Sequence, residues 1–467
     1  MLKQQKIFFE FLRFCIGSAK EIPDSLKETD WMEIYAIAKK QCLVGVLFDG
    51  IKKLPAEHVG MEKELLLHWM AESQMLEKAN VRLNDAAIQV SGWFRKKGFR
   101  TCILKGQGNA LMYPNPYSRT PGDIDIWVEG GDKRVISFVR SISPHEKACY
   151  HHIEFPSYKG VEVEVHYRPS FLLCFWHNRK LQKYYERVKE EQYSHRVMLG
   201  EQGEIAIPTE EFNVIFQLTH IFSHLMNEGI GLRQLVDYYY VLCDFYKVYQ
   251  NSSKITPSLF TLKEGDFSNH PVPLSQEGST FSPSPSSSGS GDVTAPSRCS
   301  EPLRSKDGGP SKVSPDCAGW DRRDAIGDMT SDTTSTSTDS SVTAARSSFA
   351  ASPSTAIDRV RKELKELGLW KFAGGIMYIM QEVFGMPASR LIVPPNEKYG
   401  RFVLNEVLEA GNFGRHDERN RFGRSKLGHN LQRVYRDMRL VKYFPAEALS
   451  EPIFRTWHFF WRLKHRR

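Results

Sequence analysis

GDIDIWV, residues 122–128, is the stretch that decides the fold. Asp123 and Asp125 alternate with isoleucines, and side chains two residues apart in a strand point to the same face. The alternation predicts a strand with one apolar face against a core and two carboxylates on the opposite face. Gly122 leaves room for a ligand to approach the backbone.

Two carboxylates on one face repel each other, and burying both in the ionised state is costly without a neutralising partner. Mg²⁺ suits this role because it binds through one or two carboxylates together with phosphate oxygens. Sites with two metal ions, about 3.5–4 Å apart, usually need a further carboxylate. The next strong strand, VEVEVHY (161–167), offers Glu162, Glu164 and His166 on one face. We therefore expect two Mg²⁺ ions, with Mn²⁺ as an alternative.

The segment before the acidic strand supplies groups suited to phosphate. Leu104–Lys105–Gly106 ends a predicted strand and opens a short helix, where backbone N–H groups can reach a phosphate. Arg119, in the loop before the acids, is placed to pair with phosphate oxygens. A lone Asp-x-Asp is weak evidence, because solvated edge strands and acidic turns also contain it. The ordered set of strand, glycine turn, helix, arginine loop and two acidic strands favours a nucleotide site.

A dinucleotide-binding fold is the competing interpretation, because Gly106-x-Gly108 follows a strand and acids lie downstream near the expected distance. Leu111, however, stands where the third glycine belongs. YPNPYSRTPG (113–122) also ends the helix after barely two turns. Both departures disfavour this fold.

The pattern along the chain predicts an α+β protein, in which a small mixed-sheet core is flanked by helical N- and C-terminal regions. Strands are expected at 101–104, 123–128, 161–167 and 151–155, and the clearest helix at about 62–97. The predicted regions are a helical N-terminal region (1–98), a mixed α/β core (99–207), a helical segment (208–250), a disordered Ser/Thr/Pro/Gly-rich insertion (251–355) and a helical, basic C-terminal region (356–467).

The composition is that of a globular protein, with 467 residues of which 41% are hydrophobic, enough for two or three domains. No apolar stretch approaches the roughly 18 residues of a membrane span. Glu10 and Arg13 interrupt the apolar run at the N-terminus, which predicts an amphipathic helix of the folded protein and not a signal peptide. The eight scattered cysteines favour reduced thiols in the cytoplasm.

The net charge of +8 is concentrated at the C-terminal end, where residues 396–467 hold 16 Lys and Arg against 8 Asp and Glu. This concentration favours contact with an anionic partner such as phosphate, nucleotide, RNA or a membrane surface. GNFGRHDERNRFGR (411–424) fits either a phosphate- or RNA-binding loop or a solvated basic loop. FRTWHFFWRLKHRR (454–467) fits either docking on a membrane surface or a helix packed on the core.

Two polar pairs lie in the helical segment 208–250. His220 and His224 are four residues apart, which would let both imidazoles share a ligand, but no third ligand is evident and buried or capping histidines are the simpler interpretation. Arg233 and Asp237 have the same spacing, which predicts an intrahelical ion pair or, facing a cleft, contacts with base or acceptor. The candidates for pocket residues are these four, Glu162 and His166.

This ordered set of segments resembles the nucleotidyltransferase superfamily that includes DNA polymerase beta, and within it the bacterial uncharacterised nucleotidyltransferase family. The matching residues are Leu104-Lys105-Gly106, Arg119, Gly122-Asp123-Ile124-Asp125 and Glu164-Val165-His166-Tyr167. The stretches 219–242 and 410–414 also look like the helical half of that family.

The resemblance implies roles for individual residues. The implied catalytic and metal-binding residues are Asp123, Asp125 and Glu164, with Glu162 the less favoured third carboxylate. The implied nucleotide-binding residues are Lys105, Gly106, Gln107 and Arg119. Two features depart from the superfamily: Gln107 stands where a serine that contacts phosphate is usual, and the gap from Gly106 to Asp123 is longer.

We therefore expect a Mg²⁺-dependent enzyme that moves a nucleoside monophosphate from an NTP such as ATP to an acceptor hydroxyl and releases pyrophosphate. The sequence leaves the acceptor open among RNA, a protein and a small molecule. The alternative is a non-catalytic nucleotide- or RNA-binding module on the same fold. The intact acidic pair argues against that alternative, and Gln107 argues mildly for it.

Overall fold

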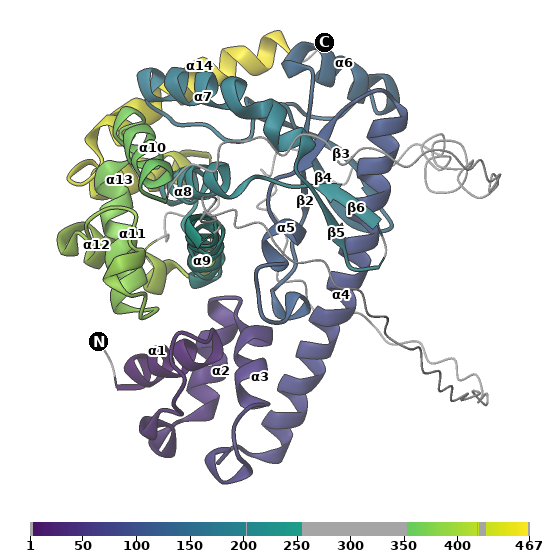
Figure 1. Ribbon diagram of the computed structural model, residues 1–467. Helices are drawn as coiled ribbons and strands as arrows, with labels where there is room; N and C mark the ends of the chain where they lie inside the picture. The colour runs from purple at the N-terminus through teal and green to yellow at the C-terminus, as the bar shows by residue number, and fades with distance from the viewer. Residues whose placement is uncertain (1–2, 202, 255–352, 418, 420–425, 466–467) are drawn as a thin grey trace, which may run out of the picture.

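The computed structural model describes residues 3–201, 203–254, 353–417, 419 and 426–465 (Figure 1). The insertion predicted for 251–355 lies outside these residues except at its ends, where α9 (Leu232–Lys254) and α10 (Pro353–Glu366) are described. The described chain is mainly helical and contains a four-stranded mixed sheet and a two-stranded sheet, which confirms the predicted α+β class.

The N-terminal α-helices lead into one long helix that reaches the sheet (Figure 1). Their bounds are α1 Lys3–Cys15, α2 Trp31–Lys40, α3 Val44–Ile51 and α4 Lys63–Lys96, the last confirming the helix predicted at about 62–97. The first half of α4 contributes Leu65 and Trp69 to one hydrophobic core, and its second half contributes Val90 and Phe94 to another. Helix α4 therefore ties the N-terminal helices to the sheet.

The main sheet confirms the four predicted strands. It contains β1 (Thr101–Ile103), β2 (Ile124–Val128), β4 (Val161–His166) and β3 (His152–Tyr158), in that order across the sheet. Strand β2 runs parallel to β4, and the other two pairings are antiparallel. A separate hairpin of β5 (Arg196–Leu199) and β6 (Gly203–Ala206) was not predicted, because strands of four residues are too short to show a clear alternation.

The remaining helices surround the sheet or form the C-terminal half (Figure 1). Their bounds are α5 Gln107–Ala110, α6 Gly131–Ile142, α7 Phe175–Ser194, α8 Glu210–Asn227, α11 Trp370–Glu382, α12 Glu397–Ala410, α13 Lys426–Val441 and α14 Pro445–Lys464. Short 3₁₀ helices are η1 Asp24–Glu28, η2 Ala56–His58, η3 Pro116–Ser118, η5 Ala388–Arg390 and η6 Asn412–Gly414. Among the described helices, none combines the length and the apolar character needed to cross a membrane.

The two faces of the main sheet have different chemistry. Ile124 and Ile126 of β2 belong to the core that the sheet shares with α4 and α6. On the opposite face, Trp127 stacks on Phe212 of α8 with 6.0 Å between ring centroids. Because Asp125 shares the face of Trp127, the acidic side chains lie on the side of the sheet that α8 covers.

Two glycine-containing turns, far apart in the sequence, cross next to the end of α8. Gly414 (φ +66°) lies so close to the carbonyl oxygen of Glu228 that a Cβ atom would clash with it. Gly231 comes similarly close to Asn412, whose Oδ1 accepts a hydrogen bond from Gln234 Nε2 at 2.9 Å. The crossing fixes the backbone of Glu228 at the edge of the site described below.

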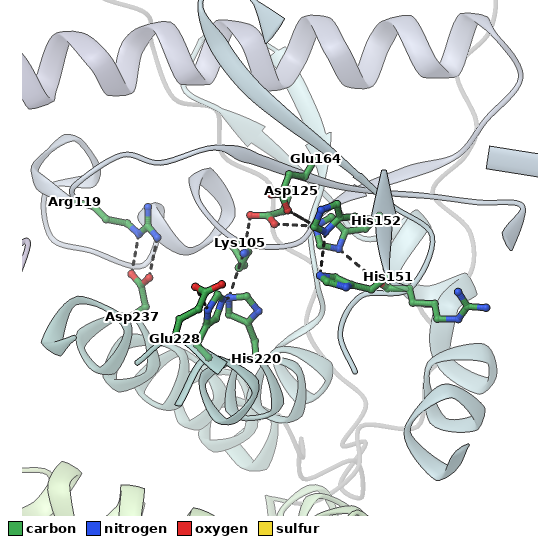
Figure 2. Close-up of polar contacts among 12 residues, drawn as sticks. Lys105, Arg119, Asp125, His151, His152, Glu164, His220, Glu228 and Asp237 are labelled. Carbon is green, nitrogen blue, oxygen red and sulfur yellow. Dashed lines mark hydrogen bonds and ion pairs between the residues drawn. The ribbon is translucent and has the colours of Figure 1, made fainter. Parts of the chain in front are cut away.

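A buried ion pair joins the loop before β2 to α9. Arg119 Nε and Nη2 donate to Oδ1 and Oδ2 of Asp237, both at 2.8 Å (Figure 2). The Tyr113 hydroxyl also donates to Asp237 Oδ1, at 2.6 Å. Both charged side chains are about 5% exposed. Such a pair is costly to break from one side, because the remaining charge stays buried and unpaired.

Replacing Asp237 with Ala should therefore lower the free energy of unfolding by about 3–5 kcal/mol. Urea denaturation of the wild type and the variant measures the difference. Asp85→Ala is the control, because the Lys159–Asp85 pair is exposed and should contribute less than about 1 kcal/mol. Equal effects of the two substitutions would contradict a structural role for the buried pair.

Candidate active site

The centre of the site is the parallel pairing of β2 with β4. In the register of this pair Asp125 lies beside Glu164, and Trp127 beside His166. One carboxylate oxygen each from Asp123, Asp125 and Glu164 lies within 4.8 Å of the other two. Two strands that are about 40 residues apart in the sequence thus bring three oxygen donors to one face of the sheet. Such a donor set can hold a divalent cation.

The three carboxylates do not share one environment. Burial and the negative charges of Asp125 and Glu164 raise the pKa of Asp123 to about 6. Asp123 forms no ion pair with any residue that the structure describes. Asp123 is therefore the least compensated of the three carboxylates, although the charge of Lys105 offsets part of its raised pKa.

Asp125, in contrast, is already neutralised by the protein. Lys105 Nζ lies 2.9 Å from Asp125 Oδ2, and His166 Nε2 lies 2.9 Å from Asp125 Oδ1 (Figure 2). Burial alone would raise the pKa of Asp125, but these two partners lower it below its ordinary value. Likewise, burial alone would lower the pKa of Lys105, but Asp125 and Asp123 raise it, so the ammonium group stays charged.

Glu164 and Glu162, the two candidates for the third carboxylate, lie on the same strand, β4, but have different surroundings. Glu164 Oε2 lies 3.4 Å from His166 Nε2 and 3.3 Å from His152 Nδ1. Glu162 points to the same side by alternation but is exposed and lies outside the carboxylate cluster. The geometry therefore favours Glu164.

Gly106 and Gln107 form the turn before α5. Gly106 has φ +57°, a conformation that glycine adopts without strain, and it precedes the first residue of α5. The Gln107 side chain is buried and donates to the Asn84 side chain of α4. The side-chain amide of Gln107 is thus directed at α4 and not at the acidic cluster.

Arg119 and Arg233, the two arginines near the acids, make contacts that differ from those predicted from the sequence. Asp237 pairs with Arg119 and not with Arg233, so the expected intrahelical ion pair is wrong. Arg233 instead donates from Nη1 to the Thr120 carbonyl oxygen at 3.0 Å and lies next to Gly122. Its Nε has no hydrogen-bond partner among the described residues. The Arg233 guanidinium thus lies beside the acidic strand with a buried Nε that lacks a partner among the described residues, whereas both ends of the Arg119 guanidinium pair with Asp237.

A chain of polar side chains leads from Asp125 into α8. Lys105 Nζ lies 3.2 Å from His220 Nε2, which lies 3.0 Å from His224 Nε2; His224 Nδ1 lies 3.3 Å from Glu228 Oε2. Figure 2 shows Lys105 between Asp125 and His220. Burial and the positive charge of Lys105 lower the pKa of His220, so this imidazole is neutral near pH 7 and accepts a hydrogen bond from Lys105.

Four residues near the site escaped the sequence analysis: Cys149, His151, His152 and Glu228. His152 lies opposite His166 in the β3–β4 pairing, which only the register could reveal. Glu228 sits at the end of α8, one turn beyond His224, a spacing that could have suggested the contact. Phe413, from the predicted loop 411–424, packs on His224 at 5.2 Å between ring centroids; residues 418 and 420–425 of that loop lie outside the described residues.

The raised pKa of Asp123 has a measurable consequence. In the folded protein this pKa exceeds the unfolded value of about 3.9, so ionising Asp123 costs folding free energy above pH 6, and the cost disappears between about pH 6 and 4. In chelator at pH 8, Asp123→Asn should therefore raise the free energy of unfolding by about 1–3 kcal/mol. Denaturation at pH 8 and pH 5 should show the gain shrinking at the lower pH. A gain that is independent of pH would contradict the assignment.

A known protein family matches the part of the chain that contains this site. The model of a family described as uncharacterised nucleotidyltransferase matches residues 27–251. No curated protein and no solved structure matches the chain. The matched segment runs from α2 into α9 and contains the main sheet, the carboxylate cluster and the histidines of α8. Residues 27–251 thus form a domain of the uncharacterised nucleotidyltransferase family, which identifies the protein as a nucleotidyltransferase.

Proposed function

We propose that the enzyme transfers a nucleoside monophosphate from a Mg²⁺-bound NTP to an acceptor hydroxyl and releases pyrophosphate. The observation that supports this reaction is the cluster of Asp123, Asp125 and Glu164 on neighbouring parallel strands. Nucleotidyl transfer develops negative charge on the phosphate being transferred and on the leaving group, and a cluster of carboxylates can serve that chemistry only through cations.

The donor set fits Mg²⁺, because all three side chains offer carboxylate oxygens. The raised pKa of Asp123 supports the fit, since it reflects burial of the carboxyl group beside two further carboxylates, a combination that a bound cation would relieve. Asp123, Asp125 and Glu164 would hold two Mg²⁺ ions, for which Mn²⁺ is an alternative. When bound, the ions would neutralise the triphosphate and the leaving pyrophosphate and make the acceptor hydroxyl more acidic.

Lys105 would bind a phosphate oxygen. Its ammonium group has three N–H donors, and contacts with Asp125 and His220 occupy two of them. The neutral His220 accepts and does not compete with a phosphate for the positive charge. Lys105 therefore keeps a donor and a charge for the nucleotide, at the end of β1 where α5 begins.

Arg233 would supply the second cationic contact to phosphate, and Arg119 would act as a positioning residue. The guanidinium of Arg233 borders Gly122 and retains a donor without a partner among the described residues. Arg119 instead fixes the loop before β2 through Asp237. This division of roles differs from the sequence interpretation, in which Arg119 contacts phosphate.

Glu164→Gln should reduce nucleotidyl transfer by about 10³-fold or more, because losing a metal ligand removes several kcal/mol of transition-state stabilisation. Pyrophosphate release from Mg²⁺–NTP, in the presence of a cell extract as the source of acceptor, measures the rate. Glu162→Gln is the matched control on the same strand and face, and it should retain transfer. Loss of activity in Glu162→Gln with activity retained in Glu164→Gln would reverse the assignment.

Arg233→Ala should raise the Kd for Mg²⁺–NTP about 10- to 100-fold, the equivalent of about 1.5–3 kcal/mol for a charged hydrogen bond. The measurement is titration calorimetry with one NTP at fixed Mg²⁺. Lys247→Ala, which removes an exposed cation from the same helix, should leave the Kd unchanged. An unchanged Kd in Arg233→Ala would show that the nucleotide does not contact this guanidinium.

A further inference from the structure

A second cluster of potential metal ligands lies beside the carboxylates. Cys149, His151 and His152 come from four consecutive positions that lead into β3. One donor atom from each lies within 4.8 Å of the other two. Cys149 Sγ is 3.4 Å from His151 Nδ1, and His151 Nε2 is 3.0 Å from His152 Nδ1. Figure 2 shows both imidazoles next to Glu164 and Asp125.

The backbone holds these three side chains in place. Cys149 N donates to the His152 carbonyl oxygen at 2.9 Å, which closes the turn. The amides of Tyr167 and Arg168 donate to the His151 carbonyl oxygen at 3.0 and 3.1 Å and anchor the turn to the end of β4. The donors are therefore arranged by the fold and need little reordering to bind a ligand.

The donor types select a class of metal. A thiolate and imidazoles favour zinc and related transition metals, whereas Mg²⁺ prefers oxygen donors. Zn²⁺ with bonds of about 2.0–2.3 Å in tetrahedral geometry places a sulfur and a nitrogen donor roughly 3.5 Å apart, and Cys149 Sγ lies 3.4 Å from His151 Nδ1.

Another thiol-containing cluster has a structural explanation. Cys174, His177 and Glu447 are also close together. There, however, the Glu447 carboxylate accepts hydrogen bonds from the amides of Leu173 and Cys174, at 2.6 and 2.9 Å, and so caps the start of α7. The three donors of the Cys149 cluster include no carboxylate, so no comparable hydrogen bonding to backbone amides explains that cluster.

We propose that Cys149, His151 and His152 form a Zn²⁺ site that adjoins the nucleotidyl-transfer site and is distinct from it. His152 Nδ1 lies 3.3 Å from Glu164 Oε2, so Zn²⁺ bound at the turn would fix the imidazole that contacts the third carboxylate. The Zn²⁺ site would thus orient the Glu164 carboxylate through His152, as hydrogen-bonding partners of metal ligands commonly do. Binding of Zn²⁺ depends only on the three donors and is tested independently of the proposed reaction, whereas the positioning of Glu164 rests on the proposed function.

The test uses the full-length protein, stripped with chelator and reloaded with Zn²⁺ or Co²⁺. Elemental analysis should find one Zn²⁺ per chain, and Co²⁺ should produce the near-ultraviolet thiolate-to-cobalt charge-transfer band. Cys149→Ser should abolish the band and weaken Zn²⁺ binding at least about 100-fold, and His152→Gln should weaken it as well.

Two control variants separate this site from its neighbours. Cys174→Ser should keep the band, because that thiol belongs to the other cluster. Asp123→Ala/Asp125→Ala should also keep it, even though Mg²⁺–NTP binding is lost. A wild-type protein that takes up no Zn²⁺, or a cobalt band that disappears in Cys174→Ser but persists in Cys149→Ser, would overturn the proposal.

Discussion

The rest of the site depends on the parallel pairing of β2 with β4, which forces like charges together. The register sets Asp125 beside Glu164, and Asp123 completes a cluster of three carboxylates. Such a concentration of negative charge is stable only with compensating cations. The fold supplies some of them, since Lys105 and His166 neutralise Asp125, but it leaves Asp123 with a raised pKa. This incomplete neutralisation supports the proposed binding of Mg²⁺ and a triphosphate at the cluster.

The helical half of the chain completes the site by long-range contacts. Helix α8 brings His220 to Lys105, and α9 brings Arg233 beside Gly122. The Arg119–Asp237 pair locks α9 onto the loop before the acidic strand. The two arginines thus differ in their contacts: Arg119 is buried and paired with Asp237, whereas Arg233 lies beside Gly122 without an acidic partner of its own.

The sequence was sufficient where the information is local. Alternation within β2 put Asp123 and Asp125 on one face, and alternation within β4 offered Glu162 and Glu164 alike. The preference for Glu164 came from the family resemblance, and the β2–β4 register shows it beside Asp125. The sequence was insufficient where the contact spans the chain. The partner of Asp237 lies 118 residues away, and the nearer Arg233 was the natural but wrong choice. His152 was missed for the same reason, since only the β3–β4 register places it opposite His166.

The most direct test of the account is calorimetric titration of ATP, GTP, CTP and UTP into the protein, with and without Mg²⁺. The account predicts binding of at least one nucleotide that requires Mg²⁺ and disappears in Asp123→Ala/Asp125→Ala. Circular dichroism of the double variant should confirm that it is folded. Nucleotide binding that is indifferent to Mg²⁺, or that survives in the folded double variant, would contradict the claim that these carboxylates hold the metal–nucleotide complex.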